Sequence, residues 1–212
     1  MDLYFSPLAC SMATCIALYE IGATAGFIMV DTKAKRVEDG SDYLAINGMG
    51  QVPVLRTDEG ELLTENPVVL QYVADRYPDS GLAPRPGTME RYRMQQWLNF
   101  TTSELHKAVF TTLLDPKSPE DAKGYARGKA ALRLGHLANN LEGREFLLDR
   151  FTIADAYLTT VLNWGRYSGV DLAQWPAVHA YYHRMLERPS VAKALAEEIA
   201  LYKAEQARSN AA

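Results

Sequence analysis

The stretch N-G-M-G-Q-V-P-V-L-R-T-D-E-G-E-L-L-T-E-N at residues 47–66 decides the fold. Residues 54–55 begin a strand, residues 58–60 turn the chain, and residues 62–63 return it as the second arm of a hairpin. Pro67 follows at once, and proline is favoured at the first position of a helix. The stretch therefore predicts a loop, a hairpin and a helix in succession.

The same stretch predicts a small-molecule site built from backbone groups. Pro53 has no N–H and cannot donate to a strand ladder. About 5–6% of X-Pro bonds in folded proteins are cis. With either isomer, the peptide groups of Val52 stay unpaired in the strand. An extended peptide ligand can pair with such groups as an added strand. Glu65 precedes a helix N-terminus, where amides attract a carboxylate while its side chain can hold an ammonium group. These features suit an amino-acid-like ligand, although an ordinary hairpin and capped helix would use the same residues.

The N-terminal part of the chain completes an α/β module around this hairpin. Residues 3–5 predict a strand, residues 10–21 a helix that Gly22 ends, and residues 27–30 a second strand parallel to the first. With the hairpin and a helix over residues 67–77 they form a βαβ-ββα unit, which needs about eighty residues.

A charged segment interrupts this module at residues 31–40. It contains Lys33, Lys35 and Arg36 and shows no apolar periodicity. We expect a solvated loop there, and a rim that contacts an anion is the alternative.

Prolines and glycines concentrate at residues 78–87, which places a linker and a domain boundary there. The remaining chain is helical in pattern, with helices expected over residues 88–114, 119–141, 152–167, 176–187 and 191–207. Thr152 and Asp155 form a variant capping box before a strongly apolar run, which predicts a buried central helix with a structural role.

Composition excludes several classes of function. The chain has 212 residues, 48% of them hydrophobic, and a net charge of −4, so it can fold into one or two domains and has no general attraction for nucleic acid. The N-terminus lacks the pattern of a signal peptide, and no apolar run reaches membrane-spanning length. We expect a cytoplasmic protein without a nucleic-acid or membrane partner.

Two cysteines, Cys10 and Cys15, are too few for a disulfide framework and are not spaced as a metal motif. Cys10 follows a proline-containing turn at the start of a helix, where orphan amides and the helix dipole stabilise a thiolate. This position favours a nucleophilic or redox cysteine. Cys15 lies mid-helix between apolar residues and is interpreted as a core residue.

Histidines occur in two patterns on the predicted helices, one in a polar stripe and one as a pair. Asn99, Ser103 and His106 share one face of the long helix after the linker, and this stripe fits either a cleft or an ordinary solvated face. His179 and His183 are four residues apart and could reach one metal ion, but acidic or cysteine partners at a metalloenzyme spacing are missing. We therefore expect no metal site.

Several segments follow one another in a characteristic order: L-Y-F-S-P-x-x-C-S, D-Y-L-A-I-N-G-M-G-Q-V-P-V-L, L-L-T-E-N, Q-W-L-N-F-x-x-S-E-L-H-K and F-T-I-A-D-A-Y. Together they resemble the cytosolic glutathione S-transferases, and among these the bacterial beta class. The resemblance covers essentially the whole chain. It implies a thioredoxin-like, glutathione-binding domain at residues 1–80, a linker at 81–87, and an all-helical domain at 88–212 that carries the electrophile pocket and the contacts of a homodimer.

The resemblance also implies roles for residues of the first domain. Cys10 would be the active-site cysteine that faces the glutathione sulfur. Val52, before a cis-Pro53, would clamp the cysteinyl unit through its backbone, and Lys35 would hold the glycine carboxylate. Glutathione would be a co-substrate, with no further cofactor.

The γ-glutamyl end would be held by Glu65 and Asn66, assisted across the dimer by Asn99, Ser103 and Glu104. Leu105 and His106, in the same segment, would complete the glutathione site, with His106 near the thiol as a second catalytic residue. These side chains supply partners for the two carboxylates and the ammonium group of glutathione.

Three functions remain open at this point. The first is a transferase in which the glutathione thiolate attacks a hydrophobic electrophile, with thiol-disulfide exchange through Cys10. The second is a glutathione-dependent oxidoreductase, isomerase or dehalogenase on the same fold. The third is a non-catalytic module that binds glutathione or regulates a partner, and retention of Cys10, Glu65 and the Val52 clamp argues against it.

Overall fold

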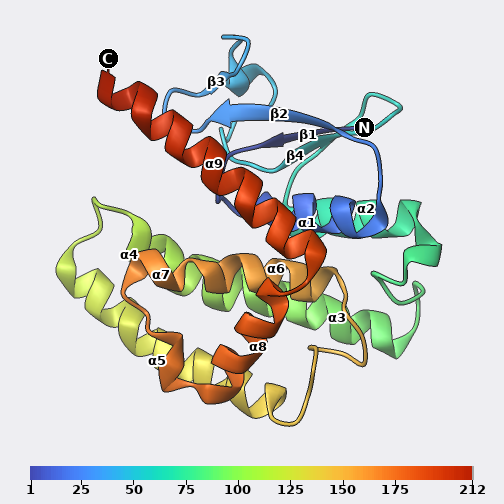
Figure 1. Ribbon diagram of the computed structural model, residues 1–212, viewed down its shortest axis with the longest axis vertical. Helices are drawn as coiled ribbons and strands as arrows, with labels where there is room; N and C mark the ends of the chain where they lie inside the picture. Colours follow the sequence, from blue (N-terminus) through green and yellow to red (C-terminus); the bar gives the residue numbers. More distant parts are fainter. Residues whose placement is uncertain (212) are drawn as a thin grey trace. The chain divides into compact units, whose positions relative to one another are not determined.

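The computed structural model describes residues 1–211 and divides into two compact units. The first contains residues 1–80 together with the C-terminal helix, and the second contains residues 81–188. Figure 1 shows a sheet with helices in the first unit and helices alone in the second. Each unit has a core of its own and is described by itself.

The first unit is organised around a mixed sheet in the order β3-β2-β1-β4-β5. Strand β1 (Asp2–Phe5) pairs in parallel with β2 (Gly26–Asp31) and antiparallel with β4 (Val54–Arg56). Strand β5 (Leu62–Leu63) completes the hairpin with β4. The predicted parallel βαβ unit and the predicted hairpin are both confirmed.

The predicted loop at residues 31–40 is wrong in part, because it contains the short strand β3 (Arg36–Val37). Val37 pairs with Val30 and Arg36 with Asp31 in antiparallel register. A strand of two residues is too short to show the alternation from which strands are predicted. Only Val37, which is buried, belongs to the core.

The helices of this unit begin and end near the predicted positions. Helix α1 covers Met12–Ile21, and Gly22 ends it with a φ of 71° in the left-handed region. The predicted start at Cys10 is wrong by two residues. The Met12 N–H donates to the Ala9 carbonyl and the Ala13 N–H to the Cys10 carbonyl. These bonds span three residues, as in a tight turn, whereas those of an α-helix span four. Helix α2 covers Asn66–Arg76, with short 3₁₀ helices at Tyr43–Ala45 (η1) and Pro78–Ser80 (η2).

One core cluster connects the sheet to the predicted site loop. It consists of buried Tyr4, Val30, Val37, Tyr43, Val52 and Val54. Val52 is therefore fixed by packing in this cluster as well as by its bond to Pro53, which precedes β4 directly.

The C-terminal helix α9 (Pro189–Ala211) packs with the first unit, whereas the predicted helical domain of residues 88–212 included it. It packs against α1 (Figure 1), where the Tyr19 hydroxyl donates to Glu197 and the Ser190 hydroxyl donates to Glu20. These pairs join residues 178 and 170 positions apart in the sequence. A pattern along the chain carries no sign of them. Ala212 lies outside the described residues.

The second unit is helical throughout its described residues. Its helices are α3 (Met89–Phe100), the π-helix η3 (Thr101–Thr111), α4 (Thr112–Leu114), α5 (Glu120–Leu141), α6 (Ile153–Asn163), α7 (Gly165–Ser168), the 3₁₀ helix η4 (Leu172–Gln174) and α8 (Pro176–Leu186). No helix within residues 1–211 is long and apolar enough to cross a membrane.

Helix α6 is the buried centre of this unit, and every one of its residues is buried. The predicted capping box is confirmed, since the Thr152 side chain caps the helix while Asp155 reaches back to the Thr152 N–H at 2.9 Å. The Asp155 carboxylate also accepts from the Leu147 N–H at 2.9 Å and from the Tyr181 hydroxyl at 3.0 Å. One buried carboxylate thus joins α6, the preceding loop and α8.

The long helix predicted for residues 88–114 is continuous, but its middle is a π-helix from Thr101 to Thr111. Backbone bonds in a π-helix run from residue i to i+5, so each turn holds more residues than in an α-helix. The predicted face of Asn99, Ser103 and His106 assumed an α-helical period and does not hold. Asn99 and Ser103 are exposed, whereas His106 is turned toward Tyr157 and Trp164.

We predict that Asp155→Ala lowers the free energy of unfolding by about 3 kcal/mol or more, because it leaves buried amide and hydroxyl donors without an acceptor. Chemical denaturation of the whole chain measures this loss. Asp149→Ala, at an exposed carboxylate nearby, is the matched control and should change stability by less than about 0.5 kcal/mol. An equal effect of both substitutions would contradict the role of Asp155.

Candidate active site

The Cys10 thiol lies against the backbone of the predicted clamp. Cys10 is half-buried, and its Sγ donates to the Val52 carbonyl at 3.1 Å. The Val52–Pro53 peptide bond is cis, as the resemblance implied. Since Pro53 is buried and lacks an N–H, the clamp consists of the peptide groups of Val52 beside a thiol.

The turn that carries Cys10 is held from two sides. The Ser11 Oγ accepts from the Ser6 N–H and donates to the Ser6 carbonyl, both at 3.2 Å. Leu8 has a φ of 61°, unusual for a residue with a side chain, and its N–H donates to Glu198 of α9 at 2.6 Å. Burial raises the pKa of Glu198 to about 8, while the Leu8 N–H counteracts this. A carboxyl group from the far end of the chain thus supports the active-site turn.

The two cysteines differ as expected. Cys15 is 2% exposed, and burial, followed by the charge of Glu198, raises the pKa of its thiol well above the ordinary value. Cys15 therefore remains a protonated core residue, which confirms its interpretation from the sequence. Cys10 is the more accessible of the two thiols.

Asn66 positions the Cys10 turn through its side chain. Its Nδ2 donates to the Cys10 carbonyl at 3.1 Å, and its Oδ1 accepts from the Thr14 hydroxyl at 3.2 Å. The residue is only 4% exposed. Its amide group is thus used within the protein, so a contact of Asn66 with a ligand would come from the backbone N–H at the start of α2.

Glu65 caps α2 with its backbone in an unusual conformation. Its φ of 66° and ψ of 111° lie outside the regions that residues with side chains favour, and such conformations cost about 1–3 kcal/mol and concentrate at functional sites. The Glu65 carboxylate is exposed and makes no capping hydrogen bond to the described residues of α2. It is therefore available to a cationic group at the helix N-terminus.

Lys35 lies at the other side of the clamp loop. Its Nζ donates to the Gly50 carbonyl at 2.9 Å, and Gly50 has a φ of 58°, in the left-handed region that favours glycine. The next carbonyl, that of Gln51, accepts from the Tyr43 hydroxyl and the Asn47 amide, both at 2.8 Å. The Lys35 bond places a positive charge at the loop before Val52, and the bonds to Gln51 hold that loop.

His106 occupies an aromatic site in the second unit. Its Nδ1 lies 2.7 Å from the hydroxyl of buried Tyr157, and its ring meets Trp164 edge to face at 4.8 Å between centroids. Burial, with a smaller contribution from the charge of Lys107, lowers its pKa to about 4. The imidazole is therefore neutral at pH 7.

The remaining predicted residues lie in the same segment of the second unit. The Ser103 hydroxyl donates to the Asn99 carbonyl at 3.0 Å, Glu104 forms an ion pair with Arg133 of α5, and Leu105 is fully buried. Glu104 and Leu105 thus have structural partners within their own unit. Asn99 and Ser103 present exposed polar groups.

The structure brings Cys10, Val52, Pro53, Asn66 and Lys35 into one connected set within the first unit, with Glu65 at its edge. Sequence reasoning missed the groups that position this set: Ser11, Thr14, Tyr43, Asn47 and Glu198. Asn-Gly at residues 47–48 marked the loop in the sequence, but the bond from the Asn47 side chain to the Gln51 carbonyl was not predicted. Glu198 could not have been found, because nothing local connects it to Leu8.

Comparisons with known proteins agree on one family. The model of the glutathione S-transferase N-terminal domain matches residues 2–75, and that of the glutathione S-transferase C-terminal domain matches residues 100–189. The chain is 41% identical to glutathione S-transferase GstA of Escherichia coli O157:H7 over 199 residues, which are 93% of this chain and 98% of that protein.

Solved structures give the same result. The bacterial glutathione S-transferase BphK, determined as a ternary complex, is 45% identical with a TM-score of 0.91, covering 93% of this chain and 99% of that one. The beta-class glutathione S-transferase of Sphingomonas chungbukensis is 45% identical with a TM-score of 0.89, covering 93% of this chain and 98% of that one.

We predict that His106 makes stability depend on pH in acid solution. Because the folded pKa of about 4 lies below the ordinary value of 6.5, the unfolded chain binds a proton first, and the stability contributed by neutral His106 is lost as pH falls from about 6.5 to 4. Relative to His106→Gln, the wild-type protein should lose about 2–3 kcal/mol of unfolding free energy over this window. His136→Gln, titrated in parallel, is the control; a difference independent of pH would refute the assignment.

Proposed function

The chain belongs to the glutathione S-transferase family, in its bacterial beta class, and from this membership we propose how its residues bind and use glutathione. The observation that carries the proposal is the hydrogen bond from the Cys10 thiol to the Val52 carbonyl, next to the cis Val52–Pro53 bond. It puts a sulfur nucleophile at a backbone edge that can pair with a peptide.

The clamp would bind the cysteinyl unit of glutathione as a short added strand. The cysteinyl N–H would donate to the Val52 carbonyl in place of the Cys10 thiol, because both donors need the same acceptor. That exchange would release the Cys10 sulfur toward the sulfur of glutathione. Lys35, held beside the loop by Gly50, would pair with the glycine carboxylate.

The γ-glutamyl end would lie at the N-terminus of α2. The first amides of that helix have no partner within the helix, and they favour a carboxylate, while the exposed Glu65 carboxylate suits the ammonium group. The strained backbone of Glu65 supports a functional role for this residue. Asn66 would act by holding the Cys10 turn and by offering its backbone N–H.

A homodimer would complete this end of the site. Asn99 and Ser103 are exposed in their own unit, and in a two-fold assembly each subunit would offer them to its partner. Glu104 would contribute from within its ion pair with Arg133. We place the protein in the cytoplasm, where a reducing environment keeps Cys10 a thiol.

The conjugation step would use the glutathione thiolate as nucleophile. It attacks the electrophilic carbon of a hydrophobic substrate, a carbon–sulfur bond forms, and the leaving group departs with the bonding electron pair. His106 fits the role of a neutral hydrogen-bonding group near that thiol, because its low pKa excludes a cationic imidazole at neutral pH.

Cys10 supports a second reaction, thiol-disulfide exchange. Its thiolate would attack one sulfur of glutathione disulfide, so that a Cys10–glutathione bond forms, the glutathione S–S bond breaks, and a glutathione thiolate leaves and takes up a proton. When a second glutathione thiolate attacks the glutathionyl sulfur of this adduct, glutathione disulfide re-forms, the Cys10–glutathione bond breaks and Cys10 leaves as a thiolate, so the exchange is reversible. Conjugation gains little from Cys10, since a thiolate so close would repel the glutathione thiolate.

We predict that Glu65→Gln weakens glutathione binding about tenfold or more, with a smaller effect on turnover of the bound complex. The substitution keeps the shape of the side chain but leaves the ligand's ammonium group unpaired, which costs about 1–3 kcal/mol. Calorimetric titration with glutathione measures the affinity. Glu61→Gln, at an exposed carboxylate in the same hairpin, is the matched control. Equal affinities for Glu65→Gln and the wild type would remove Glu65 from the site.

We predict that glutathione disulfide adds one glutathionyl group to Cys10, and that reductant removes it. Cys10→Ala should abolish the adduct and disulfide reduction while part of the conjugation of an aryl halide remains. Intact-mass measurement and the two activity assays test this, with Cys15→Ala as the control because that thiol is buried. The division of labour is wrong if the adduct sits on Cys15, or if Cys10→Ala removes both activities equally.

A further inference from the structure

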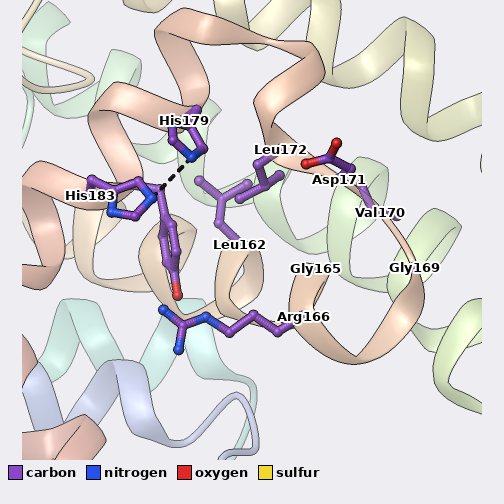
Figure 2. A pocket seen from close by; sticks show the side chains of 10 residues that line it. Leu162, Gly165, Arg166, Gly169, Val170, Asp171, Leu172, His179 and His183 are labelled. Atoms are coloured by element: carbon purple, nitrogen blue, oxygen red, sulfur yellow. Dashed lines mark hydrogen bonds between the residues drawn. The ribbon is translucent and has the colours of Figure 1, made fainter.

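A pocket in the second unit has no part in the glutathione chemistry described above. It has a volume of about 430 Å³ and lies among α6, α7, η4 and α8. Leu162 and Leu172 form an apolar side, and His179 and His183 form a polar one (Figure 2). Every lining residue belongs to residues 81–188, so the pocket is a property of this unit alone.

The two imidazoles of the pocket converge. His179 and His183 are four residues apart on α8, which puts them on one face of the helix. Their Nε2 atoms lie 3.0 Å apart, and Figure 2 shows the rings facing each other at the pocket wall. His183 is exposed and His179 is half-buried, so the pair is open to solvent. One nitrogen must donate to the other in this contact, and both are nitrogens of a kind that also binds metal ions.

We propose that His179 and His183 form a binding site for a divalent late transition-metal ion of the Ni²⁺ and Cu²⁺ type. Imidazole nitrogens bind such ions at about 2.0–2.1 Å. At that bond length two nitrogens in adjacent positions, about 90° apart, are about 2.9 Å from each other, whereas a tetrahedral angle separates them by about 3.3 Å. The separation of 3.0 Å matches the adjacent positions of a tetragonal or octahedral ion.

The other polar groups of the pocket are used elsewhere. Asp171 accepts from the Ala173 N–H at 3.0 Å, and the Tyr182 hydroxyl donates to Asn163 at 2.8 Å. Among the residues that the structure describes, no set of three or more His, Cys, Asp or Glu side chains is placed to hold a metal ion. The site therefore supplies two ligands, and water or a small external ligand fills the remaining positions. Such an ion exchanges with solvent and has no structural role.

Arg166 limits what can bind beside the ion. It lies away from the imidazole pair in Figure 2, and its guanidinium stands over the Tyr182 ring at 5.6 Å from the centroid. Its positive charge lowers the affinity for a free dication and favours an anionic co-ligand in the pocket. The sequence argued against a metal site, because acidic or cysteine ligands at a metalloenzyme spacing were missing. The structure adds the distance between the Nε2 atoms of His179 and His183.

The test is calorimetric titration of the untagged, full-length protein with Ni²⁺. We expect one Ni²⁺ per chain, and we expect His183→Gln and His179→Gln each to weaken binding at least tenfold, because a single imidazole remains. His136→Gln is the matched control, since it removes a histidine on another helix, and it should leave binding unchanged. Far-UV circular dichroism checks that the variants fold, and the exposed position of His183 makes its variant the decisive one.

Three outcomes would overturn the proposal. The first is the absence of Ni²⁺ binding to the wild-type protein. The second is full affinity in a folded His183→Gln variant. The third is loss of binding in Cys10→Ala while both histidine variants keep it, which would place the ion on the active-site thiol.

Discussion

The first unit of this protein depends on one buried amide, the side chain of Asn66. It donates to the Cys10 carbonyl and accepts from the Thr14 hydroxyl, so the start of α2, the active-site turn and α1 share one hydrogen-bonded junction. A side chain that is 4% exposed cannot exchange these partners for water without cost. The positions of the Cys10 turn, α1 and the N-terminus of α2 relative to one another are thereby fixed before any ligand binds.

The second unit uses a buried carboxylate in the same way. Asp155 accepts from Leu147, Thr152 and Tyr181, and it thus ties the entry of α6 to its neighbours. Both junctions consist of one polar side chain that satisfies several donors or acceptors where water is excluded. Such junctions select one arrangement of the segments more strictly than apolar packing does, because a misplaced segment leaves a buried polar group without a partner.

Most of the fold follows from local patterns in the sequence, and the rest depends on contacts that no local pattern contains. Gly22, Pro67 and the Thr152–Asp155 box mark helix ends through backbone chemistry of their own, and they were predicted. The two-residue strand β3 was missed because it is too short to show an alternating pattern and depends on pairing with β2 and with residues 41–42.

The π-helix and the docking of α9 were also missed. No residue within Thr101–Thr111 indicates a change from the α-helical to the π-helical period. That change turns His106 away from the predicted polar face and toward Tyr157. In the candidate site, the residues Cys10, Val52, Lys35 and Glu65 came from a family resemblance joined to plausible chemistry. Their support by distant groups such as Glu198 required coordinates.

The position of α9 has a consequence for biosynthesis. Because a ribosome synthesises the chain from its N-terminus, residues 1–80 emerge long before Pro189 does. In the folded protein, however, α9 packs against α1, and the Leu8 N–H donates to Glu198. A nascent chain that stops short of α9 holds the strands and the Cys10 turn but exposes the face of α1 that α9 covers. The turn that carries Cys10 therefore gains its hydrogen bond to Glu198 only after α9 has been translated.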